Sequence, residues 1–434
     1  MNHRILICTA ALLAGGPALS AELDYALRAG VALSDNVLRM PPDSQTSSTA
    51  AVVGVDVHGQ RPVGRLRYDV AADLAYYDYL SPGGIGSQVY GRALLTGAYD
   101  FIPDTFSWNA GLNYDQISAD MFRPLAPGNT EDVLTLSTGP TLRARFSNIM
   151  EGQLDGRYTR TSYEKRPFDN ETAGGRAMLV RRANPRSMIA VGVSYDDVSY
   201  VSKLGPSGLD YNRHELFART ELHGVRTDVQ VEAGYADVSG QSFSGGGLML
   251  RARLSRRLTP ALSAFLNGVR EYPTSEAAAL SADPTIAGGG TYDSGLLTSG
   301  PRLSSSYEGG LRFTTVRAQA ELAYLRRKEE SLLSAVGERN YDEVRARVAR
   351  NFTPRMNGSL FAVYSSEDFT AFVDKYDERI FGAQLGITFG RAMGLELRAE
   401  HRKRDGIVRE RGYSEMSGGV FLRYAPGAPR RFTP

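Results

Sequence analysis

Cysteine is nearly absent from this chain, because Cys8 is the only one in 434 residues and it lies inside the first apolar stretch. If that stretch is removed, the mature protein has no thiol, which excludes disulfide bonds, zinc-thiolate sites and cysteine nucleophiles. A dominant charge is also lacking, since Lys+Arg 50 and Asp+Glu 48 give a formal net charge of +2. Nucleic acid is therefore not an expected partner, because binding to phosphates needs a clear positive excess.

Long hydrophobic runs are missing after Ala21, where no stretch of about 18 apolar residues occurs, so no membrane-spanning helix is expected. Before that point, Arg4, an apolar run over 5–13 and small residues over 17–21 have the layout of a secretory signal peptide. The sequence thus predicts a signal peptide over residues 1–21, cut after Ser20 or Ala21, and an exported mature chain.

The mature chain has a two-residue period instead. Leu66, Tyr68 and Val70 alternate with Arg67 and Asp69, which is the pattern of a strand with two unlike faces. Helical spacing of three and four residues is hard to find. The same alternation recurs in the segments 23–33, 106–114, 134–146, 189–195, 248–254, 318–324, 381–389 and 416–424.

The connections between the predicted strands alternate in length. Nine tight links, such as 102–105 and 352–355, alternate with longer polar or Gly/Pro-rich segments, such as 118–130 and 272–300. Tight turns on one side and long loops on the other are typical of an up-and-down meander. The count is about 20 strands, with 18 as the alternative because a weak strand such as 172–182 is easily misassigned.

Barrel width decides which face of the strands points inward. Side chains already fill the interior of a barrel of about eight strands. In a barrel of about 20 strands Leu and Val cannot reach across, so the apolar face must point into lipid and the charged face must line a wet lumen. The alternative, a secreted soluble β-protein such as a propeller, should show a blade repeat, and none is found.

The sequence therefore predicts an all-β protein, a large up-and-down antiparallel transmembrane β-barrel over residues 22–424. Short periplasmic turns, long extracellular loops and the outer membrane of a Gram-negative bacterium follow from this architecture, with outer-membrane lipid and the outer-membrane assembly machinery as partners. The last strand closes on Tyr424, resembling the terminal strand that the assembly machinery recognises, and a short extension over 425–434 follows it.

Catalytic and metal-binding motifs are weak. His58 and His223 lie beside tight links, and neither belongs to the His-x-Ser arrangement that a barrel lipase needs. Asp196 and Asp197 lie near a predicted strand end, where paired aspartates are usually turn residues, and they have no identifiable histidine partner. No carboxylates have calcium-loop spacing. We predict that the protein is not an enzyme and takes no cofactor or metal.

Arginines in Arg-x-Arg spacing are the most informative polar feature. They face the lumen, with acidic residues beside them, if the apolar face points outward. Two interpretations stay open: the arginine forks guide an acidic polysaccharide or an anionic solute, or the charges form a mutually neutralising network that stiffens the wall. The predicted lumen-lining residues are Arg65, Arg67, Asp69, Asp73, Arg143, Arg145, Arg251, Arg253, Arg345 and Arg347.

The segment from Arg28 to Leu38, RAGVALSDNVL, is followed by a polar loop and by YYDY over 76–79. These features resemble a family of outer-membrane β-barrels that are encoded with exopolysaccharide and exosortase (PEP-CTERM) loci. The resemblance covers essentially the whole mature chain, because members of that family also have a signal peptide followed by one uninterrupted barrel. It implies a role in the secretion or surface assembly of exopolysaccharide and gives no catalytic residues to transfer.

The expected function is thus an outer-membrane pore or scaffold that takes part in exopolysaccharide export, with an anionic polysaccharide as a candidate partner. A general or substrate-selective porin is the alternative, in which the segment Tyr272 to Gly300 folds inward as a constriction. A barrel enzyme and a loop-based adhesin or receptor are the further alternatives.

Overall fold

The computed structural model describes residues 23–80, 85–120, 122–201, 208–273, 301–333, 337–370 and 374–426. The predicted signal peptide over 1–21 and the chain from 427 onward lie outside the described residues, so these boundaries stay predictions. The described chain is nearly all strand, with two short 3-10 turns, Pro42–Ser44 (η1) and Arg409–Arg411 (η3). No helix among the described residues is long and apolar enough to cross a membrane.

One closed antiparallel sheet of twenty strands forms the whole fold, which confirms the predicted architecture and strand count. The uncertain strand over 172–182 is present and forms the larger part of the eighth strand. The strands are β1 (Leu23–Ser34), β2 (Ser48–Arg61), β3 (Leu66–Tyr79), β4 (Gln88–Ile102), β5 (Phe106–Ser118), β6 (Thr130–Arg145), β7 (Met150–Tyr163), β8 (Asn170–Asn184), β9 (Ser187–Tyr200), β10 (Tyr211–His223), β11 (Thr227–Gly240), β12 (Ser244–Arg257), β13 (Leu262–Glu271), β14 (Arg302–Thr314), β15 (Ala318–Ser331), β16 (Glu338–Thr353), β17 (Met356–Phe369), β18 (Asp374–Phe389), β19 (Met393–Gly406) and β20 (Tyr413–Tyr424).

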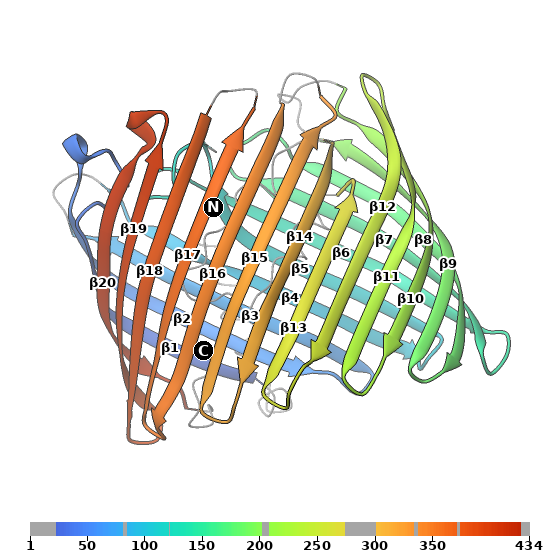
Figure 1. The fold of residues 1–434 in the computed structure, drawn as a ribbon, viewed down its shortest axis with the longest axis horizontal. Helices are drawn as coiled ribbons and strands as arrows, with labels where there is room; N and C mark the ends of the chain where they lie inside the picture. The colour runs from blue at the N-terminus through green and yellow to red at the C-terminus, as the bar shows by residue number, and fades with distance from the viewer. Residues whose placement is uncertain are drawn as a thin grey trace.

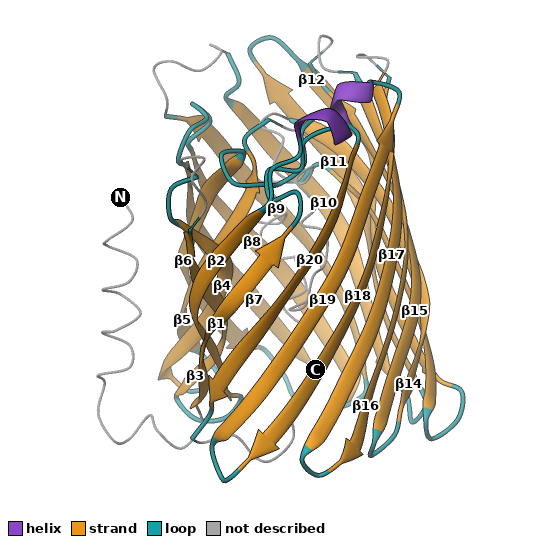
Figure 2. Ribbon diagram, turned by 90° about the vertical axis from the view of Figure 1, so that its left-hand side faces the viewer, coloured by secondary structure: helices purple, strands orange, loops and turns teal. Residues whose placement is uncertain are grey.

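Each strand pairs with the strands before and after it in the chain, and the barrel closes where β20 pairs with β1. The closing register runs from Leu27 opposite Tyr424 to Ser34 opposite Ser417. In Figure 1 the strands from β13 to β20 form the near wall and the early strands form the far wall. Figure 2 shows the tilt of the strands across the seam, which a closed barrel requires.

The two ends of the barrel differ in their connections. All nine predicted tight links are short turns of two to four residues, and they define the periplasmic end. The expectation of uniformly long loops at the other end is wrong for two connections, because residues 241–243 alone join β11 to β12 and residues 370–373 alone join β17 to β18. In the first of these connections the strands extend to the turn itself, because Val238 pairs with Gly245 and Ser239 with Ser244.

The outer wall carries the apolar residues in a belt between two aromatic girdles. Tyrosines prevail farther from the short turns, and their hydroxyls reach polar partners, as Tyr195 does with Asn212 at 2.8 Å and Tyr324 with Asp342 at 2.6 Å. The extracellular girdle contains Tyr76, Tyr158, Tyr195, Tyr235, Tyr307, Tyr324 and Tyr364, all exposed. The periplasmic girdle contains Tyr99, Phe101, Trp108, Phe146, Phe313, Phe352, Phe389 and Tyr424, also exposed.

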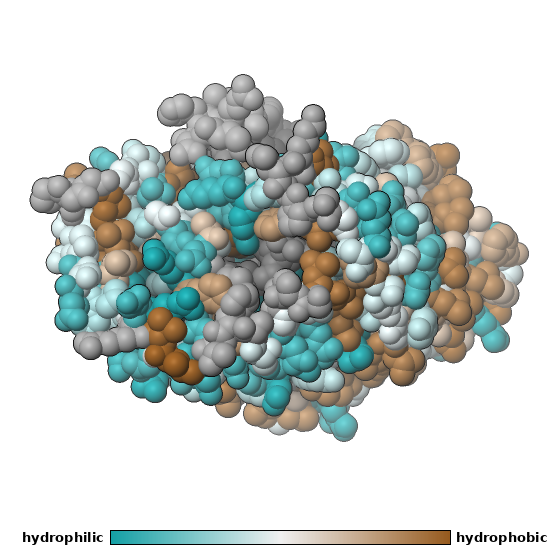
Figure 3. Space-filling view, turned by 90° about the horizontal axis from the view of Figure 1, so that it is seen from above, coloured by the Kyte–Doolittle hydropathy of each residue, from teal (hydrophilic) through white to brown (hydrophobic). Residues whose placement is uncertain are grey.

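The inner wall is charged but not uniformly polar. Toward the extracellular ends of β9–β12, Val198, Phe217, Val238 and Met249 point inward and are buried in one apolar cluster. The cluster is covered by residues from other connections, among them Tyr272 after β13. Seen from the extracellular end, hydrophilic residues gather around the mouth and brown, apolar residues lie toward the outside (Figure 3).

Neighbouring residues in one strand should therefore meet different solvents. Val193 is 52% exposed on the outer wall, and Ser194 lines the lumen. In a Cys8-free mature chain, we expect Ser194→Cys to react with a membrane-impermeant charged thiol reagent and Val193→Cys to react only with a lipid-soluble maleimide. Labelling of the folded protein in liposomes, followed by mass spectrometry, checks this, and the reverse pattern would show that the faces are exchanged.

Candidate functional site in the lumen

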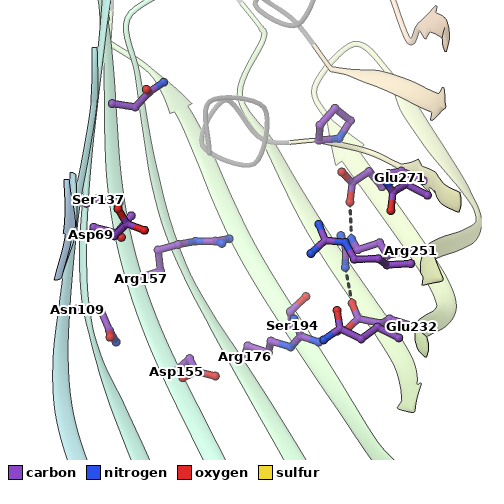
Figure 4. A pocket seen from close by; sticks show the side chains of 18 of the residues that line it. Asp69, Asn109, Ser137, Asp155, Arg157, Arg176, Ser194, Glu232, Arg251 and Glu271 are labelled. Atoms are coloured by element: carbon purple, nitrogen blue, oxygen red, sulfur yellow. Dashed lines mark hydrogen bonds and ion pairs between the residues drawn. The ribbon is translucent and has the colours of Figure 1, made fainter. Parts of the chain in front are cut away.

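A cavity of about 1300 Å³ lies in the lumen and is lined by residues from β2 to β16 (Figure 4). The described lining residues include eleven arginines and nine carboxylates, so both charge signs face the same water-filled space. The arginines are Arg61, Arg67, Arg92, Arg157, Arg176, Arg213, Arg219, Arg251, Arg253, Arg327 and Arg345. The carboxylates are Asp69, Asp115, Asp155, Asp196, Glu215, Glu232, Glu271, Glu308 and Glu343.

Half of the residues that the sequence predicts as lumen-lining surround this cavity. They come from β3, β12 and β16, which lie on different sides of it. These residues are Arg67, Asp69, Arg251, Arg253 and Arg345. The cavity therefore draws together positions that are far apart in the sequence.

The other predicted residues lie elsewhere along the lumen or at its periplasmic end. Asp73 pairs with the buried Arg28 of β1. Arg347 is two residues from Arg345 on the same face of β16.

Arg143 and Arg145 are among the last three residues of β6, next to the short turn that follows it. Arg145 is 3.6 Å from Asp104 in the 103–105 turn. Arg65 lies in the exposed turn between β2 and β3, outside both strands. The three arginines nearest the short turns are thus separated from the cavity.

Arg251 is the centre of the largest ion-pair cluster in the cavity. Its guanidinium is 2.6 Å from Glu232 and 3.1 Å from Glu215, and it also contacts Glu271. Figure 4 shows Arg251 between Glu271 and Glu232, from the neighbouring strands β13 and β11. Glu232 also pairs with Arg176 of β8, so the cluster connects four strands besides β12.

Asp196 forms a second bridge and corrects a sequence-based expectation. It lies within β9, not in a turn, and its carboxylate is 2.5 Å from Arg213 and 2.6 Å from Arg157. The β9–β10 register places Asp196 directly opposite Arg213. A buried carboxylate held by two guanidiniums is an ion-pair residue of the wall, which accounts for it without a catalytic role.

Arg345 of β16 repeats the arrangement four strands farther around the wall from Arg251. It contacts Glu308 and is 3.4 Å from both Glu321 and Glu343. These clusters match the interpretation of the arginines as a neutralised network that braces the wall. Shared carboxylates also leave guanidinium N–H groups facing water, because each fork has five donors.

A few charged groups on the cavity wall stand apart from the network. Among the described residues, Arg253 makes no ion pair and its side chain is exposed to the lumen. Asp155 is held by Thr141 at 2.6 Å and by Gln153 at 2.9 Å, without a cation. These groups are the ones with charge available to a passing solute.

The β5–β6 loop crosses the extracellular mouth. The sequence predicts this loop to be long but does not predict where it lies. From the β5–β6 loop, Phe122 packs on Phe369 of β17 with ring centroids 5.2 Å apart, and Arg411 of η3 lies 4.6 Å from the Phe122 ring. Arg39 of the β1–β2 loop donates to the Leu125 carbonyl. β5 and β17 are not neighbours, so this loop spans the mouth and narrows it.

The segment Tyr272 to Gly300, which the sequence offers as a constriction, is described only at its start. The Tyr272 carbonyl accepts a hydrogen bond from the inward-facing Arg213, and Pro273 lines the cavity. The chain thus turns into the lumen after β13, and residues 274–300 lie outside the described part. No group of three or more His, Cys, Asp or Glu side chains in the described chain is arranged to hold a metal ion.

Comparisons with known proteins give the fold and no family. No family model matches the chain, and no curated protein matches it in sequence. The FrpB iron transporter from Neisseria meningitidis matches 94% of this chain and 82% of its own, with 8% identity and a TM-score of 0.51. The siderophore receptor PirA from Acinetobacter baumannii (11% identity, 94% and 81% covered, TM-score 0.46) and OccK2 (OpdF) from Pseudomonas aeruginosa (10%, 94% and 97%, 0.39) are also similar.

The closed antiparallel barrel of twenty strands is the architecture of outer-membrane proteins of Gram-negative bacteria, and the likeness to FrpB supports this fold. At such low identity the likeness extends to the fold alone.

Removing Arg251, the cation at the centre of the cluster, should show how much the ion-pair network contributes to the free energy of unfolding. We expect Arg251→Met to lower the free energy of unfolding by about 2–4 kcal/mol, because three neighbouring carboxylates lose their shared cation. Arg253→Met, on the same face of β12, should change it by less than about 0.5 kcal/mol. Urea unfolding in micelles, followed through the fluorescence of Trp108, the single tryptophan, checks this. Equal losses of unfolding free energy in the two variants would contradict the central role of Arg251.

Proposed function

We propose that this protein is a selective outer-membrane channel for small anionic solutes that carry carboxylate or phosphate groups. The observation that supports this most directly is the charged cavity in the lumen, with its arginine excess and its exposed Arg253. Guanidinium forks match the geometry of carboxylate and phosphate oxygens and bind them bidentately. No catalytic step, cofactor or metal is part of the proposal.

The balance of charges suits passage more than tight capture. Most cavity arginines already share carboxylates, as Arg157 and Arg213 do at Asp196. A solute anion therefore meets partly neutralised guanidiniums at several successive positions. Conduction requires binding that is favourable enough for entry and weak enough for release, and such a wall meets both conditions.

The size of the solute is set at the mouth. The loop that carries Phe122 and Leu125 contacts the opposite wall, so a solute enters beside it and not through the full width of the barrel. This favours a small solute over a bulky one. Export of an acidic polysaccharide is the alternative, which rests on the resemblance of the first strand and loop and would use the same arginines.

Ion selectivity tests the role of the cavity charges. We expect Arg253→Glu to lower the chloride-to-potassium permeability ratio by about twofold or more, because it reverses an available charge in a confined space. Reversal potentials in planar bilayers under a KCl gradient measure this. Arg326→Glu makes the same charge change on the outer wall and should leave the permeability ratio unchanged within experimental error. Equal effects of the two substitutions would show that the cavity charge does not determine ion selectivity.

Conductance tests the mouth loop and separates the two functions. Replacing residues 122–127 by a short Gly-Ser linker should raise single-channel conductance by about twofold, because the narrowest described part of the mouth is opened. An unchanged conductance would mean that another segment limits flow. If the wild-type protein shows no conductance while its deletion in the host abolishes secreted polysaccharide, the channel proposal fails and export takes its place.

A further inference from the structure

Nearly all charged residues in the short turns at the periplasmic end are positive. Six of the nine turns contain an exposed arginine, and Asp104 is the one acidic residue among them. These turns lie at separate points around most of the barrel, from the β2–β3 turn to the β18–β19 turn. The turn arginines are Arg65, Arg186, Arg226, Arg317, Arg355 and Arg391.

Three further arginines lie on the outer wall just above these turns. Arg181 of β8, Arg256 of β12 and Arg350 of β16 are exposed and follow outward-facing apolar residues of the same strands. Their register partners on both neighbouring strands are uncharged. Those partners are Met150 and Ile189 for Arg181, Thr227 and Ala264 for Arg256, and Ala318 and Gly358 for Arg350.

Charges on the outer wall are organised differently at the extracellular end. There several of the cations pair with carboxylates of the protein, whereas Arg270 hydrogen-bonds to Ser305. Examples are Arg160 with Glu171 at 3.4 Å, Lys328 with Glu330 at 2.9 Å and Lys403 with Asp405 at 3.0 Å. The periplasmic arginines lack such partners among the described residues, so the described protein leaves their charge open to groups outside the barrel.

We propose that these nine arginines, here named the basic collar, bind the phosphate groups of anionic phospholipids in the periplasmic leaflet. The periplasmic girdle lies next to the collar, which puts the collar at the level of the lipid headgroups. Arginine stems can lie along apolar surface while the guanidinium reaches the interface and takes two phosphate oxygens. Distribution over most of the circumference matches a lipid annulus, whereas a protein partner would contact one sector.

The three outer-wall arginines give the sharpest test. The full-length mature protein in detergent is titrated with phosphatidylglycerol or with phosphatidylcholine, and bound lipid is counted by native mass spectrometry. We expect the wild type to retain phosphatidylglycerol at about tenfold lower lipid concentration, and R181Q/R256Q/R350Q to lose most of that preference. R160Q/R326Q/R379Q removes the same charge from the extracellular end of the outer wall and should keep it.

Three results would overturn the basic collar. Equal retention of the two lipids by the wild type would remove the lipid preference, and equal losses in the two triple variants would make it a net-charge effect. Binding of poly-glutamate that R226Q/R317Q/R391Q abolishes, without any lipid preference, would assign the turns to an acidic protein partner. A second triple variant in the turns also guards against misfolding of the first, because it should reduce phosphatidylglycerol retention independently.

Discussion

Backbone closure is the constraint on which the rest of this structure depends. In hydrocarbon every N–H and C=O must find a partner within the protein, and here that is achieved only when β20 returns to β1. Closure over twenty strands produces a lumen too wide for side chains to fill. The apolar residues therefore face lipid, and the inner wall has to be stable in water. The charge pattern of the sequence follows from that width.

A wide wet interior changes what charged residues do for stability. Pairs such as Arg251 with Glu232 and Arg213 with Asp196 connect strands that hydrogen bonds along the ladder already join. Other ion pairs of the network join strands that are not neighbours in the sheet. Arg157 pairs with Asp196 two strands away, and Arg176 pairs with Glu232 three strands away. The network thus resists flattening of the wall, and its less buried guanidiniums, such as those of Arg157 and Arg176, remain open to the lumen where a solute can meet them.

The sequence predicts most of the fold because side chains in a strand alternate with a fixed period. Val193 and Ser194 could be assigned to opposite faces from their spacing alone, and the alternation of short and long links gives the strand count. The partners of Asp196 could not be found in this way, because they depend on the stagger between strands. The contact of Phe122 with Phe369 depends on barrel closure, and no local sequence pattern predicts it. The brief 241–243 connection was missed because strands above the membrane need not be apolar.

The two aromatic girdles are chemically unlike, and this gives the barrel a polarity along its axis. Tyrosine hydroxyls such as that of Tyr195 are hydrogen-bonded to the wall above the belt, whereas the girdle at the other end mixes Tyr99, Trp108 and Tyr424 with phenyl rings such as Phe313 and Phe389. Sinking the hydroxylated girdle into hydrocarbon costs more than moving a phenyl ring the same distance. The barrel is therefore held at its depth by two different stops. The tyrosine girdle resists displacement toward the periplasm, and the outward-facing arginines beside the short turns resist displacement toward the cell surface.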